Sequence, residues 1–385
     1  MDPANCLSMY AIVCSPKAKA LWPNALEALR LKHNAKWPGK VHVVTYDGKA
    51  GVHSCLEELS KLQPSFCCFV THHSECSREF IQEVNRLTRR IDLSLPYYDT
   101  LWGILTGLVE DDVLFAIKQE PLMIGRVVGN CPIDLDKFHS GLWFSEFEQG
   151  VSFRKDASMP RAVQEACKED TTELIVGELS TERQGEGGVD MVITSGHATE
   201  DDWNIGYAFA SGEFRCCSGQ LYGRELCGNR MDVKPTSTPK VLSAAGNCLM
   251  GHISDENCMA LGWMHSASVV QMVGYVVPTW FGFGGWGVHK YFLNNPGSMT
   301  FAEAFFANQQ SLLHELHSKY ESHVGTSLDD HERVYRRCFG TEESVSESLP
   351  RYCLGLLYDC DNVAFYGDPA WEARLSPKPE TYHYR

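Results

Sequence analysis

The chain lacks a long apolar run: no stretch of about 18 or more apolar residues occurs among its 385 residues. Residues Met1 to Tyr10 also lack the basic and then apolar layout of a secretion signal. No Asn-x-Ser/Thr acceptor for N-linked sugar is present. These absences argue against a membrane partner and a secretory route, so the sequence predicts a cytoplasmic protein.

Basic residues are outnumbered by acidic ones. Thirty-four Lys and Arg residues face 49 Asp and Glu residues, which gives a formal net charge of −15. A nucleic-acid-binding protein normally carries a basic patch, so this balance argues against a nucleic-acid partner. A cationic substrate suits an acidic chain better.

Several motifs of other enzyme classes are missing. There is no C-x-x-C, H-E-x-x-H, G-x-S-x-G or G-x-x-x-x-G-K-[ST] segment. His314 and His317 are three positions apart without a third ligand in view, so no metal ligands are predicted. The segment Gly282–Gly287 spells G-x-G-x-x-G, but bulky Phe283 and Trp286 argue against a nucleotide site. We expect a flexible aromatic loop there.

Sixteen cysteines are present, but they do not form a compact disulfide framework. They are spread along the chain, with vicinal pairs at Cys67-Cys68 and Cys216-Cys217. A free Cys packs like a small apolar side chain. We therefore expect most of them to be reduced core residues.

Strand-like and helix-like segments alternate along the first third of the chain, which is typical of an α/β protein with a mostly parallel sheet covered on both faces. The length suggests two tandem lobes. Their expected bounds are 8–145 and 150–372, with a loose boundary near 135–155 and a C-terminal tail at 373–385.

The expected strands lie at 10–14, 41–46, 66–71, 173–176, 269–277, 353–358 and 362–366, besides the two that carry the candidate site. The expected helices lie at 17–32, 55–62, 79–90, 161–169, 257–265 and 301–320. A hairpin is expected around 209–222 and an exposed loop at 181–188.

Two apolar runs end in residues that suit nucleophilic catalysis. Residues 189–196 lead to His197, and residues 240–247 lead to Cys248. In parallel sheets, functional groups collect beyond the carboxyl ends of strands. A thiol needs a neighbouring base, and an imidazole is one. The joint pattern predicts a cysteine hydrolase.

Wider segments resemble the gingipain-type cysteine peptidases, relatives of the caspases. Residues 194–203 resemble the catalytic-histidine segment, and residues 244–251 with 258–261 resemble the nucleophile segment and the helix after it. Residues 273–280 are similar to the next strand, and 362–369 to the closing motif. Residues 99–107 and 124–126 are similar to parts of the family's first subdomain.

The resemblance implies a caspase-like three-layer αβα fold and an endopeptidase with Cys248 as nucleophile and His197 as proton carrier. The backbone N–H groups of Cys248 and Ala198 would hold the oxyanion. The family usually has glycine where this chain has Ala198, and an alanine would be strained if the position required a positive φ. The family commonly binds calcium, but no ligands are matched in this chain.

Specificity residues follow from the same resemblance. Asp99 matches the aspartate at the bottom of the primary pocket in arginine-specific members, and Trp280 matches a tryptophan that lines it. A buried carboxylate pairs with a guanidinium through two charge-assisted hydrogen bonds, which favours cleavage after Arg. The alternatives are that Asp99 caps a turn and that Trp280 is core or turn packing.

Two other functions stay open from the sequence. The chain is either an active peptidase acting on peptide or protein substrates, or an inactive relative that serves as a binding module. A nucleotide-binding enzyme is the third and more distant alternative. The sequence does not decide the oligomeric state.

Overall fold

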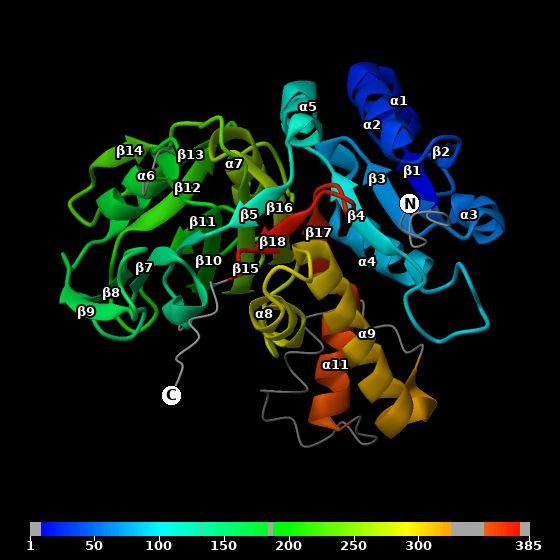
Figure 1. Cartoon of the computed structure of the whole chain (residues 1–385). Coiled ribbons are helices and arrows are strands. Elements are labelled where there is room, and N and C mark those ends of the chain that lie inside the picture. The colour runs from blue at the N-terminus through cyan, green and yellow to red at the C-terminus, as the bar shows by residue number, and fades with distance from the viewer. Residues whose placement is uncertain (1–8, 132, 184–187, 325–349, 378–385) are drawn as a thin grey trace, which may run out of the picture.

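The computed structural model describes residues 9–131, 133–183, 188–324 and 350–377 (Figure 1). Over these residues the chain is an α/β protein with ten α-helices and a 12-stranded mixed sheet. The strand order is β2-β1-β3-β4-β17-β16-β15-β10-β6-β7-β8-β9. Eight of the eleven pairings are parallel. None of the described helices has both the length and the apolar composition needed to cross a bilayer.

The sheet consists of two parallel parts that run in opposite directions. The first part contains β1 (Tyr10–Cys14), β2 (Val41–Thr45), β3 (Phe66–Val70) and β4 (Leu101–Leu105). The second contains β6 (Arg126–Gly129), β7 (Ser140–Phe144), β10 (Met191–Gly196), β15 (Lys240–Asn247) and β16 (Val269–Tyr275). They meet at β17 (Val363–Tyr366), which pairs parallel with β4 and antiparallel with β16. The carboxyl ends of the second part therefore share an edge with the amino end of β4.

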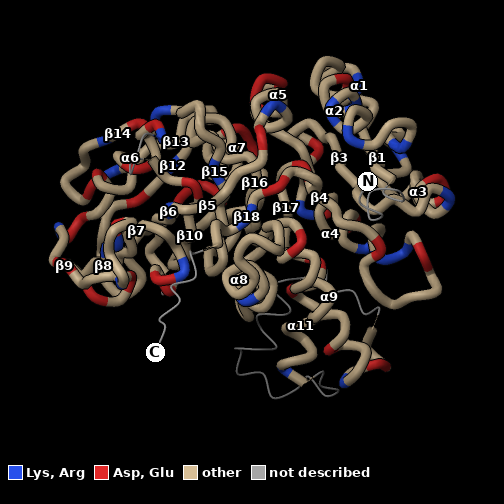
Figure 2. Tube along the Cα trace, in the orientation of Figure 1, with Lys and Arg blue, Asp and Glu red and all other residues tan. Residues whose placement is uncertain are grey.

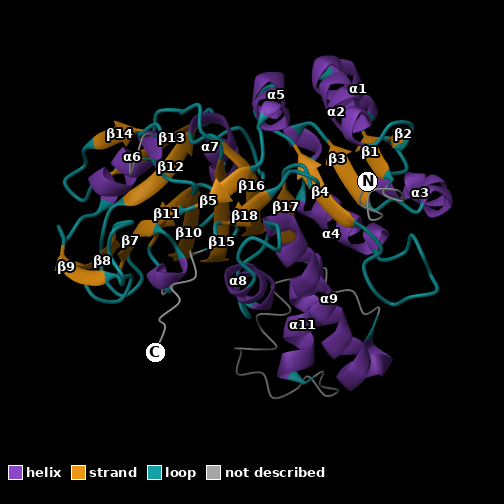
Figure 3. Ribbon diagram, in the orientation of Figure 1, coloured by secondary structure: helices purple, strands orange, loops and turns teal. Residues whose placement is uncertain are grey.

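The other strands lie at the margins of this sheet or outside it (Figure 3). The antiparallel margin is formed by β8 (Val151–Lys155) and β9 (Val163–Ala166). A separate four-stranded sheet contains β11 (Asp202–Asn204), β12 (Glu213–Cys217), β13 (Gln220–Arg224) and β14 (Arg230–Asp232). A two-stranded sheet joins β5 (Leu122–Ile124) to β18 (Ala373–Leu375).

Helices cover both faces of the main sheet. On one face lie α1 (Pro16–Leu21), α2 (Pro23–Lys36) and α5 (Glu110–Lys118). On the other lie α3 (Leu56–Leu62), α4 (Arg78–Thr88), α8 (Phe283–Asn294), α9 (Phe301–Tyr320) and α11 (Arg351–Asp361) (Figure 1). Of the remaining helices, α6 (Thr172–Ser180) packs on β13, and α7 (Met259–Ser266) on β13 and β16. Short 3₁₀ helices span Val52–Cys55, His73–Glu75, Leu135–Lys137 and Glu321–His323.

Alternation along β1 shows why the sheet is buried on both faces. Ile12 and Cys14 pack in one apolar cluster with α1, α2 and α5, whereas Ala11 and Val13 pack in the cluster of the opposite face. All five residues of β1 are fully buried. Successive side chains of a strand point to opposite faces, so a continuous apolar run requires helices on both sides.

The chain order of the strands cuts across the expected lobes. β6 and β7 belong to the expected first lobe, 8–145, yet they pair with β10 in the second part of the sheet. The expected tail begins with β18, which is a strand; residues 378–385 of that tail lie outside the described residues. Residues 184–187 of the expected loop also lie outside them.

Three expected elements are wrong in type. Residues 161–169 were expected to be helical but contain β9, and residues 173–176 were expected as a strand but lie in α6. The expected strand 353–358 lies in α11. The expected helix 17–32 is two helices, because Pro23 begins α2 directly after α1 ends.

The expected cysteine state agrees with the structure over the described residues. None of the fourteen cysteines described there forms a disulfide, and ten of them are buried. Only Cys217 and Cys227 are exposed among these fourteen.

Asp368 joins the end of β17 to the first part of the sheet. Its carboxylate contacts His33 Nε2 at 2.7 Å and accepts a hydrogen bond from Tyr10 Oη at 2.8 Å. Burial alone would raise the pKa of Asp368, but the charge and hydrogen bond of His33 hold that pKa at about 2. The closing segment of the chain is thus anchored by a buried polar pair.

We expect Asp368→Asn to lower the free energy of unfolding by about 3 kcal/mol at pH 7, because it leaves His33 without its buried carboxylate. A depressed carboxyl pKa gives stability that is present above about pH 4 and is lost as the pH falls through about 2. The difference in unfolding free energy between wild type and Asp368→Asn, measured by urea unfolding, should therefore be smaller at pH 3 than at pH 7. Asp232→Asn, which breaks only the exposed pair with Arg230, is the control. Equal urea midpoints for Asp368→Asn and wild type at pH 7 would contradict the anchor.

Candidate functional site

The carboxyl ends of β10 and β15 lie side by side. The two strands are parallel neighbours, and the last paired residues are Gly196 and Asn247. His197 and Cys248 each follow directly, on strands that lie about 4.8 Å apart. The structure therefore brings the predicted imidazole and thiol to one edge of the sheet. His197 is exposed and Cys248 is half-buried, so both can be reached by a substrate.

Asn247 fixes the backbone on both sides of this edge. Its side-chain amide donates to the carbonyl of Gly196 at 3.1 Å and accepts from Thr194 Oγ1 at 2.5 Å. The backbone carbonyl of Asn247 accepts a hydrogen bond from Thr279 Oγ1 at 2.9 Å. One buried side chain thus ties the segment before His197 to the segment before Cys248.

The glycines before the two candidate residues allow a close approach. Gly196 has φ +94°, a conformation that other residues rarely adopt. A side-chain carbon at Gly246 would lie 2.9 Å from both Ser195 Cβ and Trp286 Cζ2. Larger residues would therefore disturb both turns.

The Cys248 sulfur accepts a hydrogen bond from the backbone N–H of Thr279 at 3.1 Å. Leu249, the next residue, has φ +56°, which is uncommon for a residue with a side chain. Such conformations cost of order 1 kcal/mol and persist where surrounding contacts hold them, often at functional sites. Leu249 N–H donates to the carbonyl of Val277 at 3.2 Å, which is one of those contacts.

Two backbone N–H groups lie just beyond the ends of β10 and β15. Within the described residues, the N–H groups of Cys248 and Ala198 donate no hydrogen bond. Ala198 is not among the described non-glycine residues with positive φ. The alanine that replaces the glycine usual in the resembling family is therefore accommodated without left-handed strain.

His197 is held through its backbone and its ring. Its carbonyl accepts from Asn204 N–H at 2.9 Å, as part of the bridge between Ala198 and Trp203. Its ring stacks on Tyr207, with centroids 4.7 Å apart and planes 16° apart. Exposed Phe147 packs edge-on against Tyr207 at 5.6 Å. An aromatic surface thus adjoins the imidazole.

Glu146 is a buried carboxylate beside Ser195 and Gly196, the two residues before His197, and the sequence analysis did not identify it. Its Oε2 accepts a hydrogen bond from Ser195 Oγ at 2.8 Å and lies 3.5 Å from where a side-chain carbon of Gly196 would be. Burial raises the pKa of Glu146. It follows the carboxyl end of β7, a strand that the sequence analysis did not predict, so the strand-end rule had no strand to apply to there.

If Cys248 and His197 act as the sequence predicts, Glu146→Gln should lower kcat for peptide cleavage about tenfold to 100-fold with KM changed by less than about twofold. The amide can still accept from Ser195, but it supplies no negative charge for a protonated His197. Steady-state kinetics with a fluorogenic peptide measure both constants. Glu148→Gln, two residues further along and exposed, should leave both unchanged; an unaltered kcat in Glu146→Gln would remove Glu146 from the site.

Trp280 follows the residue that contacts the Cys248 sulfur. It is partly buried against the core, two positions beyond Pro278. Tyr358 of α11 donates to the Pro278 carbonyl at 3.0 Å, which holds this turn. Trp280 therefore follows the residue that contacts Cys248, and its packing also fits the alternative of core or turn packing.

The segment that follows Trp280 is not the expected flexible loop. Gly282, with φ +77°, precedes α8, which begins at Phe283. Asp359 Oδ2 accepts from Gly284 N–H at 2.8 Å and from Tyr275 Oη at 2.7 Å. Burial raises the pKa of Asp359 to about 6. Helix formation places the Gly282–Gly287 backbone inside a packed structure.

Asp99 lies at the same sheet edge, before β4. Three strand spacings separate β4 from β15, a distance of about 14 Å. The Asp99 carboxylate accepts a hydrogen bond from the backbone N–H of Asp92 at 2.8 Å. The backbone N–H of Asp99 donates to the carbonyl of Thr88 at 3.0 Å. Burial raises the pKa of Asp99. The described contacts of Asp99 are those of a turn, and none of them joins it to Cys248, His197 or Trp280.

Carboxylates gather just beyond His197. Burial and the neighbouring charges of Glu200 and Asp255 raise the pKa of Asp201. Figure 2 shows acidic and basic positions interspersed over both halves of the molecule. Among the described residues, no group of three or more His, Cys, Asp or Glu side chains is arranged to hold a metal ion. The local excess of negative charge suits a cationic substrate group.

The arrangement at this edge contains the parts of an acyl-transfer site. A reachable thiol and imidazole lie on adjacent strand ends, with two backbone donors and a buried carboxylate beside them. These parts follow the carboxyl ends of three parallel strands of one sheet, β7, β10 and β15. In the comparisons with known proteins, no family model, no curated protein and no solved structure matches the chain.

Proposed function

We propose that this chain is a cysteine endopeptidase that uses a Cys248–His197 dyad. The observation that carries the proposal is the register of β10 and β15, which sets the two residues directly beyond the paired Gly196 and Asn247. A thiol and an imidazole at neighbouring strand ends supply a nucleophile and its base. The unpaired N–H groups of Cys248 and Ala198 supply the oxyanion donors.

The proposed reaction is acyl transfer in two halves. His197 takes the proton from the Cys248 thiol, and the thiolate attacks the carbon of the scissile carbonyl. The carbonyl oxygen becomes an oxyanion that accepts hydrogen bonds from the two N–H groups. His197 then gives its proton to the leaving amine as the C–N bond breaks, which leaves a thioester on Cys248.

Water completes the second half. His197 takes a proton from a water molecule, whose oxygen attacks the thioester carbonyl. The C–S bond breaks, the peptide leaves as a carboxylic acid, and the proton on His197 returns to the thiolate. In this scheme Glu146 stabilises the protonated imidazole, and the aromatic surface of Tyr207 limits its movement.

The fold supports this proposal at a coarse level. A mostly parallel sheet with helices on both faces is compatible with the caspase-like three-layer sandwich that the resemblance implies. Fold alone does not give function, so the site geometry carries the argument.

The proposed specificity is for a basic residue, Arg, on the acyl side of the cleaved bond. The resemblance places Asp99 in the pocket for that residue and Trp280 in its wall. The carboxylates of Glu200, Asp201 and Asp255 add negative charge near His197, which attracts a cationic substrate at low ionic strength.

We expect Asp99→Asn to lower kcat/KM for an Arg substrate at least about tenfold, because a charge-assisted pair with the guanidinium is lost. The matching Gln substrate should be unaffected. Asp92→Asn, on the same turn, is the control, since its side chain makes only an exposed local hydrogen bond. An unchanged Arg preference in Asp99→Asn would assign Asp99 to the turn alone.

Digestion of an equimolar peptide library, read by mass spectrometry, tests the proposal itself. The wild-type protein should release fragments with new C-termini, enriched in Arg. Saturable binding of peptides without any cleavage would favour the inactive binding module. A thermal shift with NAD or ATP, without cleavage, would favour a nucleotide-binding enzyme.

A further inference from the structure

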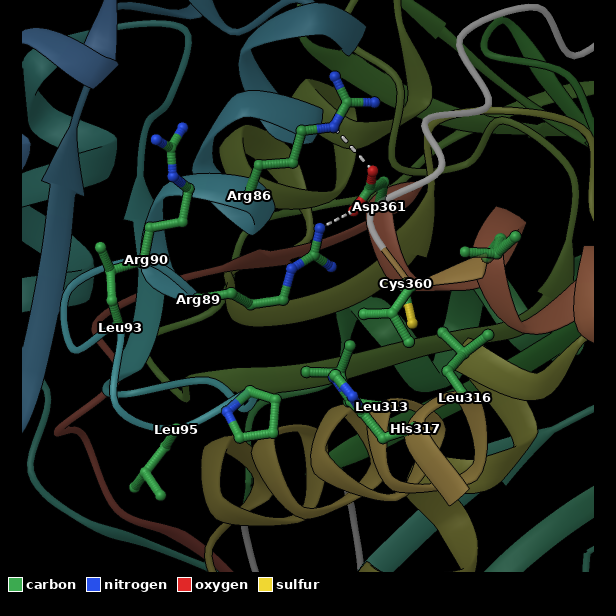
Figure 4. Close-up of a pocket in the computed structure, with 13 residues that line it drawn as sticks. Arg86, Arg89, Arg90, Leu93, Leu95, Leu313, Leu316, His317, Cys360 and Asp361 are labelled. Carbon is green, nitrogen blue, oxygen red and sulfur yellow. Dashed lines mark hydrogen bonds and ion pairs between the residues drawn. The ribbon is translucent and has the colours of Figure 1, made fainter. Parts of the chain in front are cut away.

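A second site lies among α4, α9, α11 and the chain before β4 (Figure 4). It is a cavity of about 480 Å³, within the range typical of ligand pockets. Neither Cys248 nor His197 lines it. This site is independent of the proposed peptidase function.

The charged side chains that line the cavity have a net charge of opposite sign to the net charge of the whole chain. Three arginines and one aspartate are among the described residues that line it, and these residues have a formal charge of +3 − 1 = +2 with His317 counted as neutral. The whole chain carries −15. The three arginines are Arg86, Arg89 and Arg90, which α4 and its end bring to one side.

Two of the arginines are fixed in place. Arg86 Nε lies 2.8 Å from one carboxylate oxygen of Asp361, and Arg89 Nη2 lies 2.6 Å from the other (Figure 4). Arg89 Nη1 also donates to Tyr98 Oη at 3.2 Å. A guanidinium has five N–H donors, so a group already oriented by one carboxylate can also contact a second anion. Arg90 is exposed and pairs with no carboxylate of the described residues.

The other described residues of the lining, apart from His317, are apolar. Leu313 and Leu316 of α9 and Leu357 of α11 form buried walls. Leu93 and Leu95 stand at the opening with 80% and 56% of their surface exposed. No other large hydrophobic residue of the described chain is as exposed as Leu93. Exposed apolar side chains at the mouth of an apolar cavity mark a surface that a ligand can cover.

We propose that this cavity binds an anionic amphiphile, a molecule with a carboxylate or phosphate head and an unbranched alkyl body. The head contacts Arg90 and the oriented guanidinium group of Arg89. The alkyl body lies between Leu95 and the leucines of α9 and α11. Both halves of the ligand are needed, because the arginine side and the leucine side line the same cavity.

Calorimetric titration of the full chain with ten-carbon probes, below the concentrations at which they form micelles, tests the site. Decanoate and decyl phosphate should each bind saturably at one site, and the tighter of the two identifies the head group. Decanol should bind more weakly, and decyltrimethylammonium should not bind. Decanol or the cation binding as tightly as both anions would overturn the proposal.

Substitutions at two exposed positions distinguish binding of the head from binding of the alkyl body. Arg90→Gln should weaken decanoate about threefold to tenfold and leave decanol unchanged. Leu95→Gln should weaken both probes. The controls are Arg161→Gln and Leu226→Gln, which are exposed and do not line the cavity. Wild-type affinity for decanoate in both Arg90→Gln and Leu95→Gln, with unchanged urea midpoints, would show that the binding lies elsewhere.

Discussion

Cys248→Ala should lower kcat/KM for peptide cleavage by about 10⁴-fold to 10⁶-fold, because the substitution removes the only atom proposed to bond to the substrate. The residual rate would come from substrate binding and the two oxyanion donors. Stability should change by no more than about 1 kcal/mol, since Cys248 is half-buried and its sulfur accepts one hydrogen bond, from Thr279. Progress curves with an Arg fluorogenic peptide measure the loss.

Other thiols provide the matched controls for that experiment. Cys217→Ala and Cys227→Ala remove the two exposed cysteines of the described residues. Both variants should keep the wild-type rate. If Cys248→Ala also keeps that rate while remaining folded, the thiol is not the nucleophile.

His197→Gln should lower kcat/KM by about 10³-fold to 10⁴-fold. Glutamine preserves much of the side-chain volume but cannot take the thiol proton or return it to the leaving amine. The variant should also react more slowly with iodoacetamide at neutral pH, because the thiolate is no longer formed by proton transfer to a neighbouring imidazole. Alkylation quenched at a series of times, with modification of Cys248 measured by mass spectrometry, gives that rate.

His314→Gln is the control for the imidazole. His314 is exposed and contacts Tyr97 Oη at 3.1 Å, outside the candidate site. Wild-type cleavage and alkylation are expected in this variant. A His197→Gln protein with wild-type cleavage would show that the two residues do not act together.

Strands of the main sheet could be predicted because their apolar runs are short and rich in β-branched residues. Tyr10–Cys14 and Phe66–Val70 were expected within one residue of their observed ends, and both are paired and buried in the structure. The candidate dyad followed from the same signal, since a strand end places a side chain at the edge of a sheet.

The wrong elements have identifiable physical causes. Residues 353–358 form an apolar run that a buried helix and a buried strand share, and only the packing of α11 against α4 and α9 decides between them. In α6, Ile175, Val176 and Leu179 are buried, a spacing that requires the residues beyond the expected strand. β9 consists of exposed residues that pair with β8, so a non-local contact overrides local preference.

Glu146 could not be singled out because its role depends on a non-local neighbour. The sequence shows one acidic residue near an expected lobe boundary, whereas the structure places it against Ser195 through the pairing of β7, β6 and β10. The same pairing explains why the expected boundary near 135–155 does not coincide with the two parts of the sheet. Strand order is set by the whole chain, and local patterns do not contain it.

The most direct test of the dyad is covalent labelling with a peptidyl arginine chloromethyl ketone, followed by peptide mapping of all 16 cysteines. The reagent binds as a substrate and alkylates a thiol that a base activates. We expect one adduct, on Cys248, that is absent from His197→Gln. Labelling of Cys217 and Cys227 in proportion to their exposure, with Cys248 unmodified, would contradict it.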